Sequence, residues 1–304
     1  MRIFLTGGTG YIGAAVLDAL VRAGHHVDAL VRNTHKAARV EERGAHPVRG
    51  DLASPDTYTS FAAAADVIVH AAFEYTARGA TVDATAVDAL LTAARASASV
   101  RAFIYTSGVW VLGNTPTPAD ESAPVNPIEL TAWRPEHERR VLDAASPTLR
   151  TIVVRPGVVY GGGRGVVGEI LKDASNSLIR VIGSGDNRWS LVYDRDLADL
   201  YLRLVEHADA SGIYHANDEG DERVNEIVAA ISEHAKTTPS VRHVPLAEAK
   251  QKMGPYAEAL ALDQVVRSPR ARALGWVPSL KSVSGNAARL FEEWRRSAQR
   301  DAGA

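Results

Sequence analysis

The sequence predicts an α/β protein, a doubly wound parallel sheet with a smaller C-terminal region. Over residues 1–155, short runs rich in β-branched residues alternate with longer alanine-rich stretches of helical periodicity. This alternation is typical of a parallel sheet covered by helices on both faces. Beyond Arg155 it gives way to shorter elements and glycine-rich loops, beginning with residues 161–165. We therefore expect one domain over residues 1–155 and a smaller region over residues 156–304, partly interleaved with it.

The expected strands are short apolar runs bounded by polar residues or glycine. They are Arg2–Thr6, His26–Val31, His46–Arg49, Val67–Ala71, Ala102–Thr106 and Thr151–Arg155. The expected helices are Ile12–Ala23, Thr34–Arg43, Thr57–Ala64, Val82–Ser97 and Pro135–Ala145. Gly24 follows the first helix as a C-cap glycine does. Pro135 lacks an N–H group and suits a first helical turn, so the fifth helix is expected to begin there.

A glycine motif follows the first strand directly. Gly7, Gly10 and Gly13 have the spacing Gly-x-x-Gly-x-x-Gly and lead into the first helix. In such a motif the first glycine permits the tight turn, the second lets the backbone approach a pyrophosphate, and the third allows close helix packing. The helix N-terminus then points its amides at the phosphates. The motif predicts a Rossmann-type dinucleotide-binding domain.

Composition excludes several other classes of function. The net charge of −2 provides no field that would attract nucleic acid or an anionic membrane. Cysteine is absent, which excludes disulfides and cysteine-based metal sites or nucleophiles. No apolar run approaches the roughly 20 residues that span a bilayer. The first strand begins at the N-terminus and leaves no room for a signal peptide, so a cytoplasmic protein is expected.

The end of the second strand bears on the choice of cofactor. NAD-binding domains carry an acidic residue there for the ribose 2′-hydroxyl, whereas an arginine suits the 2′-phosphate of NADP. Here Val31 is followed by Arg32, and Asp28 lies too early in the strand to serve. Arg32 can fork onto a phosphate, and Lys36 can add a point charge. The sequence favours NADP over NAD.

Together with later landmarks, the glycine motif resembles the extended short-chain dehydrogenase/reductase family, which includes NAD(P)-dependent epimerases, dehydratases and reductases. The landmarks are Gly50-Asp51-Leu52, His70-Ala71-Ala72, Phe103 to Gly108, Arg155 to Gly161, Leu191 to Ala198 and Leu274 to Pro278. Their order and spacing cover nearly the whole chain. The resemblance implies that Asp51 lies against the adenine and that small residues after the fourth strand line the cofactor. The implied cofactor-binding residues are Gly7, Thr9, Gly10, Tyr11, Ile12, Gly13, Arg32, Asp51, Leu52, Ala71, Ala72, Thr106 and Pro156.

The chain departs from this family at the catalytic positions. The family uses a tyrosine for proton transfer, a lysine four residues later, a serine or threonine and an asparagine. None of the nine tyrosines here has a lysine four residues on. Alignment with the family puts Leu130 at the tyrosine position, Arg134 at the lysine position and Asp83 at the asparagine position. Gly108 falls at the serine position, and a slip of one residue lets Ser107 serve.

Replacement chemistry requires another acid or base beside the nicotinamide. Glu74 and Tyr75 follow the fourth strand and are candidates, while Asp83 either relays a proton or faces solvent from its helix. Tyr105 is expected in the core, and His137 on the surface between Glu136 and Glu138. Trp110, Trp133 and Trp189 wall an apolar pocket or complete a core. Ten scattered histidines show no paired metal-ligand spacing.

Three functions are compatible with these observations. The favoured one is an NADP-dependent oxidoreductase of a small carbonyl or alcohol substrate. A sugar-nucleotide epimerase or dehydratase is disfavoured because Trp189 stands where the family often has an arginine for the nucleotide phosphate, with Arg188 displaced by one. A non-catalytic NADP(H)-binding sensor is favoured by the missing tyrosine and lysine. We expect a small-molecule substrate, no metal, no nucleic-acid or membrane partner, and a monomer or homodimer.

Overall fold

The computed structural model describes residues 1–302, with side chains described through residue 299, and confirms the predicted α/β fold class. A seven-stranded sheet has the order β12-β7-β5-β4-β1-β2-β3. Its strands are β1 (Arg2–Thr6), β2 (His26–Val31), β3 (His46–Arg49), β4 (Val67–His70), β5 (Ala102–Thr106), β7 (Arg150–Pro156) and β12 (Gly212–Ala216). The pairs from β3 across to β7 are all parallel. The strand order reverses between β1 and β4, which is where doubly wound sheets bind ligands.

The chain forms two compact units by the density of its internal contacts. The first comprises residues 1–107, 133–155 and 197–214, and the second comprises residues 108–132, 156–196 and the chain from His215 onward. Residues 108–132 and the long stretch after 214 therefore share a unit, while residues 197–214 join the N-terminal one. The predicted domains, 1–155 and 156–304, are divisions along the sequence, and their boundary stays a prediction.

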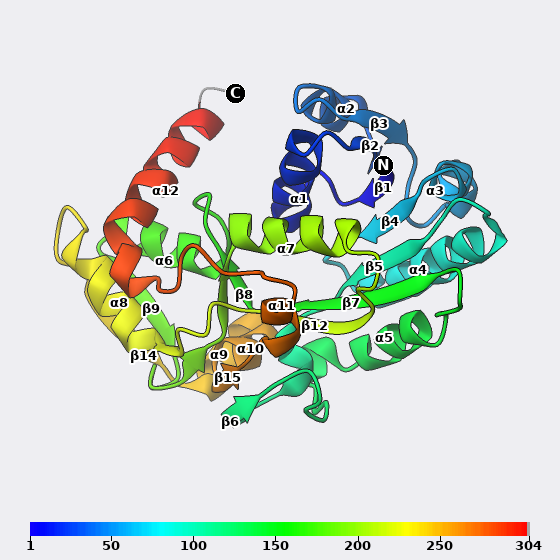
Figure 1. The fold of residues 1–304 in the computed structure, drawn as a ribbon. Helices are drawn as coiled ribbons and strands as arrows, with labels where there is room; N and C mark the ends of the chain where they lie inside the picture. The colour runs from blue at the N-terminus through cyan, green and yellow to red at the C-terminus, as the bar shows by residue number, and fades with distance from the viewer. Residues whose placement is uncertain (303–304) are drawn as a thin grey trace. The chain divides into compact units, whose positions relative to one another are not determined.

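The helices of the first unit cover its sheet on both sides. They are α1 (Tyr11–Arg22), α2 (Thr34–Glu41), α3 (Thr59–Ala63), α4 (Gly79–Ala96), α5 (Arg134–Leu142) and most of α7 (Asp194–Glu206). Figure 1 shows α1 and α7 on one side of the strands and α4 and α5 on the other. Between α4 and the sheet, Phe4, Ile68 and Phe103 are fully buried with Val87 and Leu90 of the helix. Burying these apolar side chains stabilises the layered arrangement.

The end of α1 and the start of α5, which glycine and proline mark in the sequence, lie within one residue of their predicted places. Gly24 has φ +83° directly after the C-cap residue Ala23, which is the left-handed conformation that ends many helices. Pro135 lies in the first turn of α5. β1, β2, β3 and β5 have the predicted bounds, and the other elements differ by a few residues at their ends.

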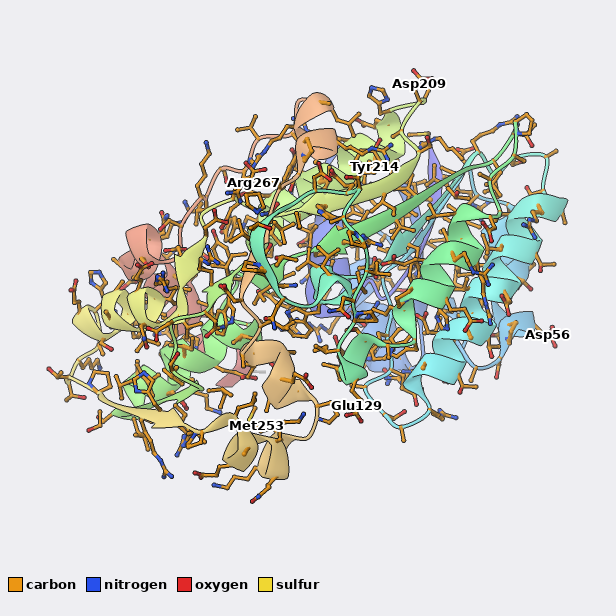
Figure 2. All side chains as sticks on the ribbon, turned by 90° about the horizontal axis from the view of Figure 1, so that it is seen from below. Asp56, Glu129, Asp209, Tyr214, Met253 and Arg267 are labelled. Atoms are coloured by element: carbon orange, nitrogen blue, oxygen red, sulfur yellow. The ribbon has the colours of Figure 1, made fainter. Side chains whose placement is uncertain are left out.

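The second unit is built from short elements. Its strands are β6 (Thr115–Ala119), β8 (Val158–Tyr160), β9 (Leu178–Ile182), β10 (Arg188–Trp189), β11 (Leu191–Tyr193), β13 (Glu222–Arg223), β14 (Ser240–Val244) and β15 (Gln264–Val266). They form the two-stranded sheets β10-β13, β11-β8, β14-β9 and β15-β6. Its helices are α6 (Gly165–Ser175), α8 (Val224–Glu233), α9 (Leu246–Met253), α10 (Tyr256–Leu260), α11 (Pro269–Ala273) and α12 (Ala287–Ala302). Arg267, labelled in Figure 2, pairs with Asp221 at 2.6 Å just beyond β15.

A buried carboxylate fixes the C-terminal segment within the second unit. Asp196 is 6% exposed and accepts hydrogen bonds from the Ser279 amide, the Ser279 hydroxyl and the Leu280 amide at 2.9, 2.6 and 3.0 Å. Its backbone oxygen accepts from the indole of fully buried Trp276 at 2.7 Å. Two of the recognised sequence motifs are thus held together by hydrogen bonds. No helix among residues 1–302 is both long and apolar enough to cross a membrane.

The hydrogen bonds of Asp196 predict that alanine substitution of two aspartates of α7 lowers the free energy of unfolding by very different amounts. Asp196→Ala should lower the free energy of unfolding by about 3 kcal/mol, because it leaves buried amides without an acceptor. Asp199→Ala is the matched control, since Asp199 is 43% exposed and, among the described residues, forms an ion pair only with Arg203 across one helical turn. Its loss should cost less than about 0.5 kcal/mol. Urea unfolding of both variants measures the difference, and equal costs would contradict the assignment.

Candidate functional site

The predicted cofactor-binding residues of the first unit lie at one edge of the sheet. The glycine loop follows β1, Arg32 follows β2, Asp51 and Leu52 follow β3, Ala71 and Ala72 follow β4, and Thr106 ends β5. Because these strands are parallel and paired in register, their carboxyl ends share an edge. Pro156 ends β7 and is buried. This is the edge at which open α/β sheets bind ligands.

The three glycines of the loop have different physical reasons to be glycine. Gly7 has φ +79°, and a Cβ there would lie 2.6 Å from the backbone oxygen of Ala71. A Cβ on Gly13 would lie 2.1 Å from the backbone oxygen of Gly7. Gly10 has φ −79°, which suits any residue, and its Cβ would meet only the Gly7 oxygen, at 3.1 Å, within 4 Å among the described residues. The fold therefore requires Gly7 and Gly13, whereas exposed Gly10 leaves open space in front of the helix.

Helix α1 begins at this open space with its amides unsatisfied by side chains. Gly10 is its N-cap residue, and in the described part of the chain no side chain caps the helix. Thr9, Tyr11 and Ile12 around it are half-buried. The first amides of a helix carry a partial positive charge that favours a phosphate. The loop therefore fits the pyrophosphate of a dinucleotide, because the first amides of α1 attract phosphate and Gly10 leaves room for it.

Basic side chains gather at the end of β2. Arg32 is exposed and forms no ion pair with any described residue. Asn33 caps α2 by accepting from the Lys36 amide at 2.9 Å. Partial burial and the charges of Arg32 and Arg39 lower the pKa of Lys36, so the three cations share one surface. Asp28 is fully buried and pairs with Arg2 at 2.6 Å near the start of the sheet, which leaves no carboxylate of β2 beside Arg32 among the described residues.

A buried carboxylate occupies the centre of the first unit behind this edge. Asp83 of α4 is 3% exposed and faces groups from β4, β5 and α5. Its Oδ1 lies 3.2 Å from His70 Nε2, and its Oδ2 lies 2.7 Å from His137 Nδ1 and 2.8 Å from the Tyr105 hydroxyl. Burial by itself raises the pKa of Asp83, but the hydrogen bonds from His137, His70 and Tyr105 outweigh it and lower the pKa below its usual value.

One expectation about this cluster was wrong, and one of two alternatives is excluded. His137 was expected on the surface, yet it is 5% exposed because its ring reaches the Asp83 carboxylate. The alternative that Asp83 faces solvent is excluded by its burial. Tyr105 lies in the core as expected, and burial followed by the charge of Asp83 raises its pKa well above the ordinary value. The sequence held a signal for Asp83, since it lies on the same helical stripe as buried Val87 and Leu90.

Ser107 belongs to a second buried polar group. Its hydroxyl donates to Glu138 at 2.5 Å, and Glu138 pairs with Arg155 at 2.5 Å. All three side chains are more than nine-tenths buried. The ion pair joins α5 to β7, and sequence reasoning did not single out Glu138. Whether Ser107 acts in catalysis stays a prediction.

Arg134 is stacked against two aromatic rings rather than free in solvent. Its guanidinium lies 4.5 Å from the Trp133 ring and 5.4 Å from the Phe73 ring, and it donates to the backbone oxygen of Thr106 at 3.2 Å. Phe73 and Trp133 are themselves stacked at 5.2 Å. Tyr75 contacts Phe73 edge-on and is 91% exposed. Arg134 therefore lies at the end of β5, beside the predicted cofactor residue Thr106.

The remaining candidates divide between core and surface. Glu74 pairs with Arg78 at 2.7 Å. In the second unit, Trp189 is 5% exposed and donates to the Leu260 oxygen at 3.0 Å, so it completes a core. Leu130 and Trp110 pack against the cluster of Ile128, Ala259 and Leu262. Within the described residues, no group of three or more histidine, aspartate or glutamate side chains is arranged to hold a metal ion.

Comparisons with known proteins agree with this arrangement. The model of the NAD dependent epimerase/dehydratase family matches residues 3–216. The uncharacterized protein C2A9.02 of Schizosaccharomyces pombe is 31% identical over 289 residues, which cover 92% of this chain and 95% of that protein. The 4-hydroxy-2-methyl-3-oxo-4-farnesyl-3,4-dihydroquinoline-1-oxide ketoreductase of Stigmatella aurantiaca is 27% identical over 261 residues, covering 82% and 78%.

Among solved structures, the human epimerase family protein SDR39U1, crystallised with NADPH, superposes with a TM-score of 0.79. It is 21% identical in sequence, and the match covers 96% of this chain and 99% of that chain. At this identity the likeness shows the fold alone.

The different roles of the glycines predict different outcomes of substitution. Gly10→Val should abolish dinucleotide binding while the chain stays folded, because the new side chain enters the open space in front of α1. Gly13→Ala should lower both stability and binding, because its Cβ cannot fit beside the Gly7 oxygen. Calorimetric titration with NADPH, paired with thermal unfolding, separates the two. Full affinity in Gly10→Val would mean that the loop is only a turn.

Proposed function

The chain belongs to the NAD dependent epimerase/dehydratase family, and from this premise we propose that it is an NADPH-dependent oxidoreductase of a small carbonyl or alcohol substrate. Membership of the family indicates an NAD(P)-dependent oxidoreductase or epimerase/dehydratase. The proposal is narrower, and its cofactor choice rests on one observation. Arg32 is exposed and unpaired among the described residues at the end of β2, where an NAD enzyme carries a carboxylate.

In this proposal different residues of the chain bind different parts of the cofactor. The glycine loop and the amides of α1 hold the pyrophosphate, and Arg32 with Lys36 holds the 2′-phosphate. Asp51 and Leu52 contact the adenine. Ala71, Ala72, Thr106 and Pro156 line the nicotinamide half. When bound, the cofactor supplies the hydride.

The contacts of Arg188 favour a reductase over a sugar-nucleotide epimerase. Arg188 forms an ion pair with Asp263 at 2.7 Å, and its Nε donates to the same carboxylate at 2.8 Å. Trp189 is buried beside it. An arginine engaged in this way is a poor ligand for a nucleotide diphosphate, because binding would require breaking a double contact. The curated relative from Stigmatella aurantiaca, named as a ketoreductase, supports the same choice.

A non-catalytic NADP(H) sensor is the second candidate, and Leu130 favours it. Leucine has no proton to give, and Leu130 packs in an apolar cluster with Ile128 and Leu262. Guanidinium groups do not act as ordinary proton donors in proteins, so Arg134, at the position of the family's lysine, does not replace the missing acid. The two candidates differ in one measurable property, turnover.

The proposed preference for NADPH predicts that one substitution reverses the order of the affinities for NADPH and NADH. The unaltered chain should bind NADPH about ten- to a hundredfold more tightly than NADH, from a charge-assisted contact of roughly 1.5–3 kcal/mol. Arg32→Asp should reverse this order. Arg39→Asp on α2 is the control, because it changes the net charge equally on the same surface. Calorimetric affinities for both cofactors provide the measurement. Equal affinities in the unaltered chain would refute the NADP assignment.

The reductase and the sensor make opposite predictions for NADPH consumption. The reductase should oxidise NADPH in the presence of at least one of ethyl acetoacetate, benzaldehyde and menadione, followed by the loss of NADPH absorbance. Gly10→Val supplies the background rate, since it should not bind the cofactor. A chain that binds NADPH but consumes none above that background would favour the sensor.

A further inference from the structure

Reduction of a carbonyl needs a proton as well as a hydride, and the residues aligned with the family's tyrosine and lysine supply none. The oxygen of the substrate becomes a hydroxyl, so an acid must stand within hydrogen-bond reach of it. Leu130 has no proton, and the guanidinium of Arg134 does not release one. If the chain is the reductase proposed above, on which this inference rests, another group supplies the proton.

The two histidines that contact Asp83 differ in how many of their ring nitrogens have hydrogen-bond partners. Asp83 is ionised because its pKa is lowered, so each group facing it must donate. His70 therefore donates through Nε2, and its Nδ1 lies 2.6 Å from the Thr6 hydroxyl, which itself accepts from the Ala72 amide at 3.2 Å. Both nitrogens of His70 are engaged. The ring of His70 is locked as a structural link between β1, β4 and α4.

His137 has only one nitrogen engaged. Its Nδ1 donates to Asp83 at 2.7 Å, while its Nε2 has no hydrogen-bond partner among the described residues. The side chain is 6% exposed. Nε2 is not among the buried polar atoms that lack a partner in the described part of the chain, so this nitrogen is accessible from outside, as a proton donor must be. The ring lies 4.8 Å from Trp133, edge to face, next to the Arg134 stack at the end of β5.

We propose that His137, oriented by Asp83, is the proton donor that takes over from the family's tyrosine. A carboxylate that accepts from Nδ1–H fixes the tautomer and the orientation of the ring, so that Nε2 is the nitrogen left to exchange a proton. In the reduction, the hydride adds to the carbonyl carbon as NADPH becomes NADP⁺, and the carbonyl π bond opens. The oxygen takes the proton from Nε2–H, which leaves a neutral imidazole that water reprotonates. In alcohol oxidation the same nitrogen accepts the proton.

The other polar groups nearby are less suited to this role. The hydroxyl of Ser107 donates to Glu138, and the hydroxyl of Tyr105 donates to Asp83 with its pKa well above 10. Asp83 carries no proton. Tyr75 is 91% exposed and contacts the Phe73 ring edge-on, so its hydroxyl is not held in a buried site.

The test compares a substitution of His137, whose Nε2 has no hydrogen-bond partner among the described residues, with a substitution of His70, whose two ring nitrogens are both engaged. His137→Asn keeps an N–H group where Nδ1 stood, so it can still donate to Asp83, but it has no nitrogen at the Nε2 position. It should lower kcat for the carbonyl that the chain reduces by about 10²-fold or more, with NADPH affinity unchanged by calorimetry. His70→Gln is the matched control. It is equally buried and keeps the contact with Asp83, and it should retain kcat within about threefold.

A pH profile separates proton donation from a structural role. Turnover of the unaltered chain in the direction of reduction should fall as pH rises, because only the protonated ring can give a proton. The residual turnover of His137→Asn should not follow that fall. His137 contacts Asp83 of α4 directly, and Tyr105 of β5 and His70 of β4 share that carboxylate. The charged groups beside it on α5 are Arg134, Glu136 and Glu138.

The outcomes are distinguishable. Unchanged kcat in His137→Asn overturns this proposal and leaves the proposed reductase intact. Equal losses in both variants that track their thermal unfolding also overturn it, since they would indicate a purely structural cluster. No turnover by the unaltered chain with either cofactor overturns the proposed function itself, and this proposal with it.

Discussion

The arrangement of the first unit depends on one buried negative charge. Removing a carboxylate from water is costly unless hydrogen bonds replace its hydration. Asp83 meets this requirement with donors from His70, Tyr105 and His137, which lie on β4, β5 and α5. Since each donor comes from a different element, the carboxylate fixes α4, the middle of the sheet and α5 relative to one another. The end of β5 and the start of α5, where Arg134 and Trp133 lie, are positioned by the same contacts.

The sequence was most informative where local chemistry decides the structure. An apolar run followed by spaced glycines leaves few alternatives, so β1, the loop and α1 were predicted nearly to the residue. Tight turns and strand burial are short-range properties that a window of residues contains. The family resemblance also rested on such local motifs, and the family match confirms it.

The candidate site was harder to predict because its contacts link residues far apart in the chain. His137 lies between two glutamates, a sequence context that predicts a surface residue. Only the fold brings it into contact with Asp83, which lies 54 positions earlier in the chain. Glu138 was missed for the same reason, since its partner Arg155 lies on another element. Asp83 itself had a local signal, a polar residue on an apolar helical stripe. A charge on such a stripe predicts buried partners, but the sequence does not say which.

The division into two units has a consequence for how the chain folds during synthesis. The backbone passes between the units five times, after residues 107, 132, 155, 196 and 214. The central sheet gains β12 only at residues 212–216, so the N-terminal unit remains incomplete until more than two thirds of the 304 residues have been made. Neither unit corresponds to a continuous piece of sequence. A ribosome-bound nascent chain must therefore keep β7 without one neighbour for many residues, and an exposed strand edge of this kind is a site where chaperones or aggregation compete with folding.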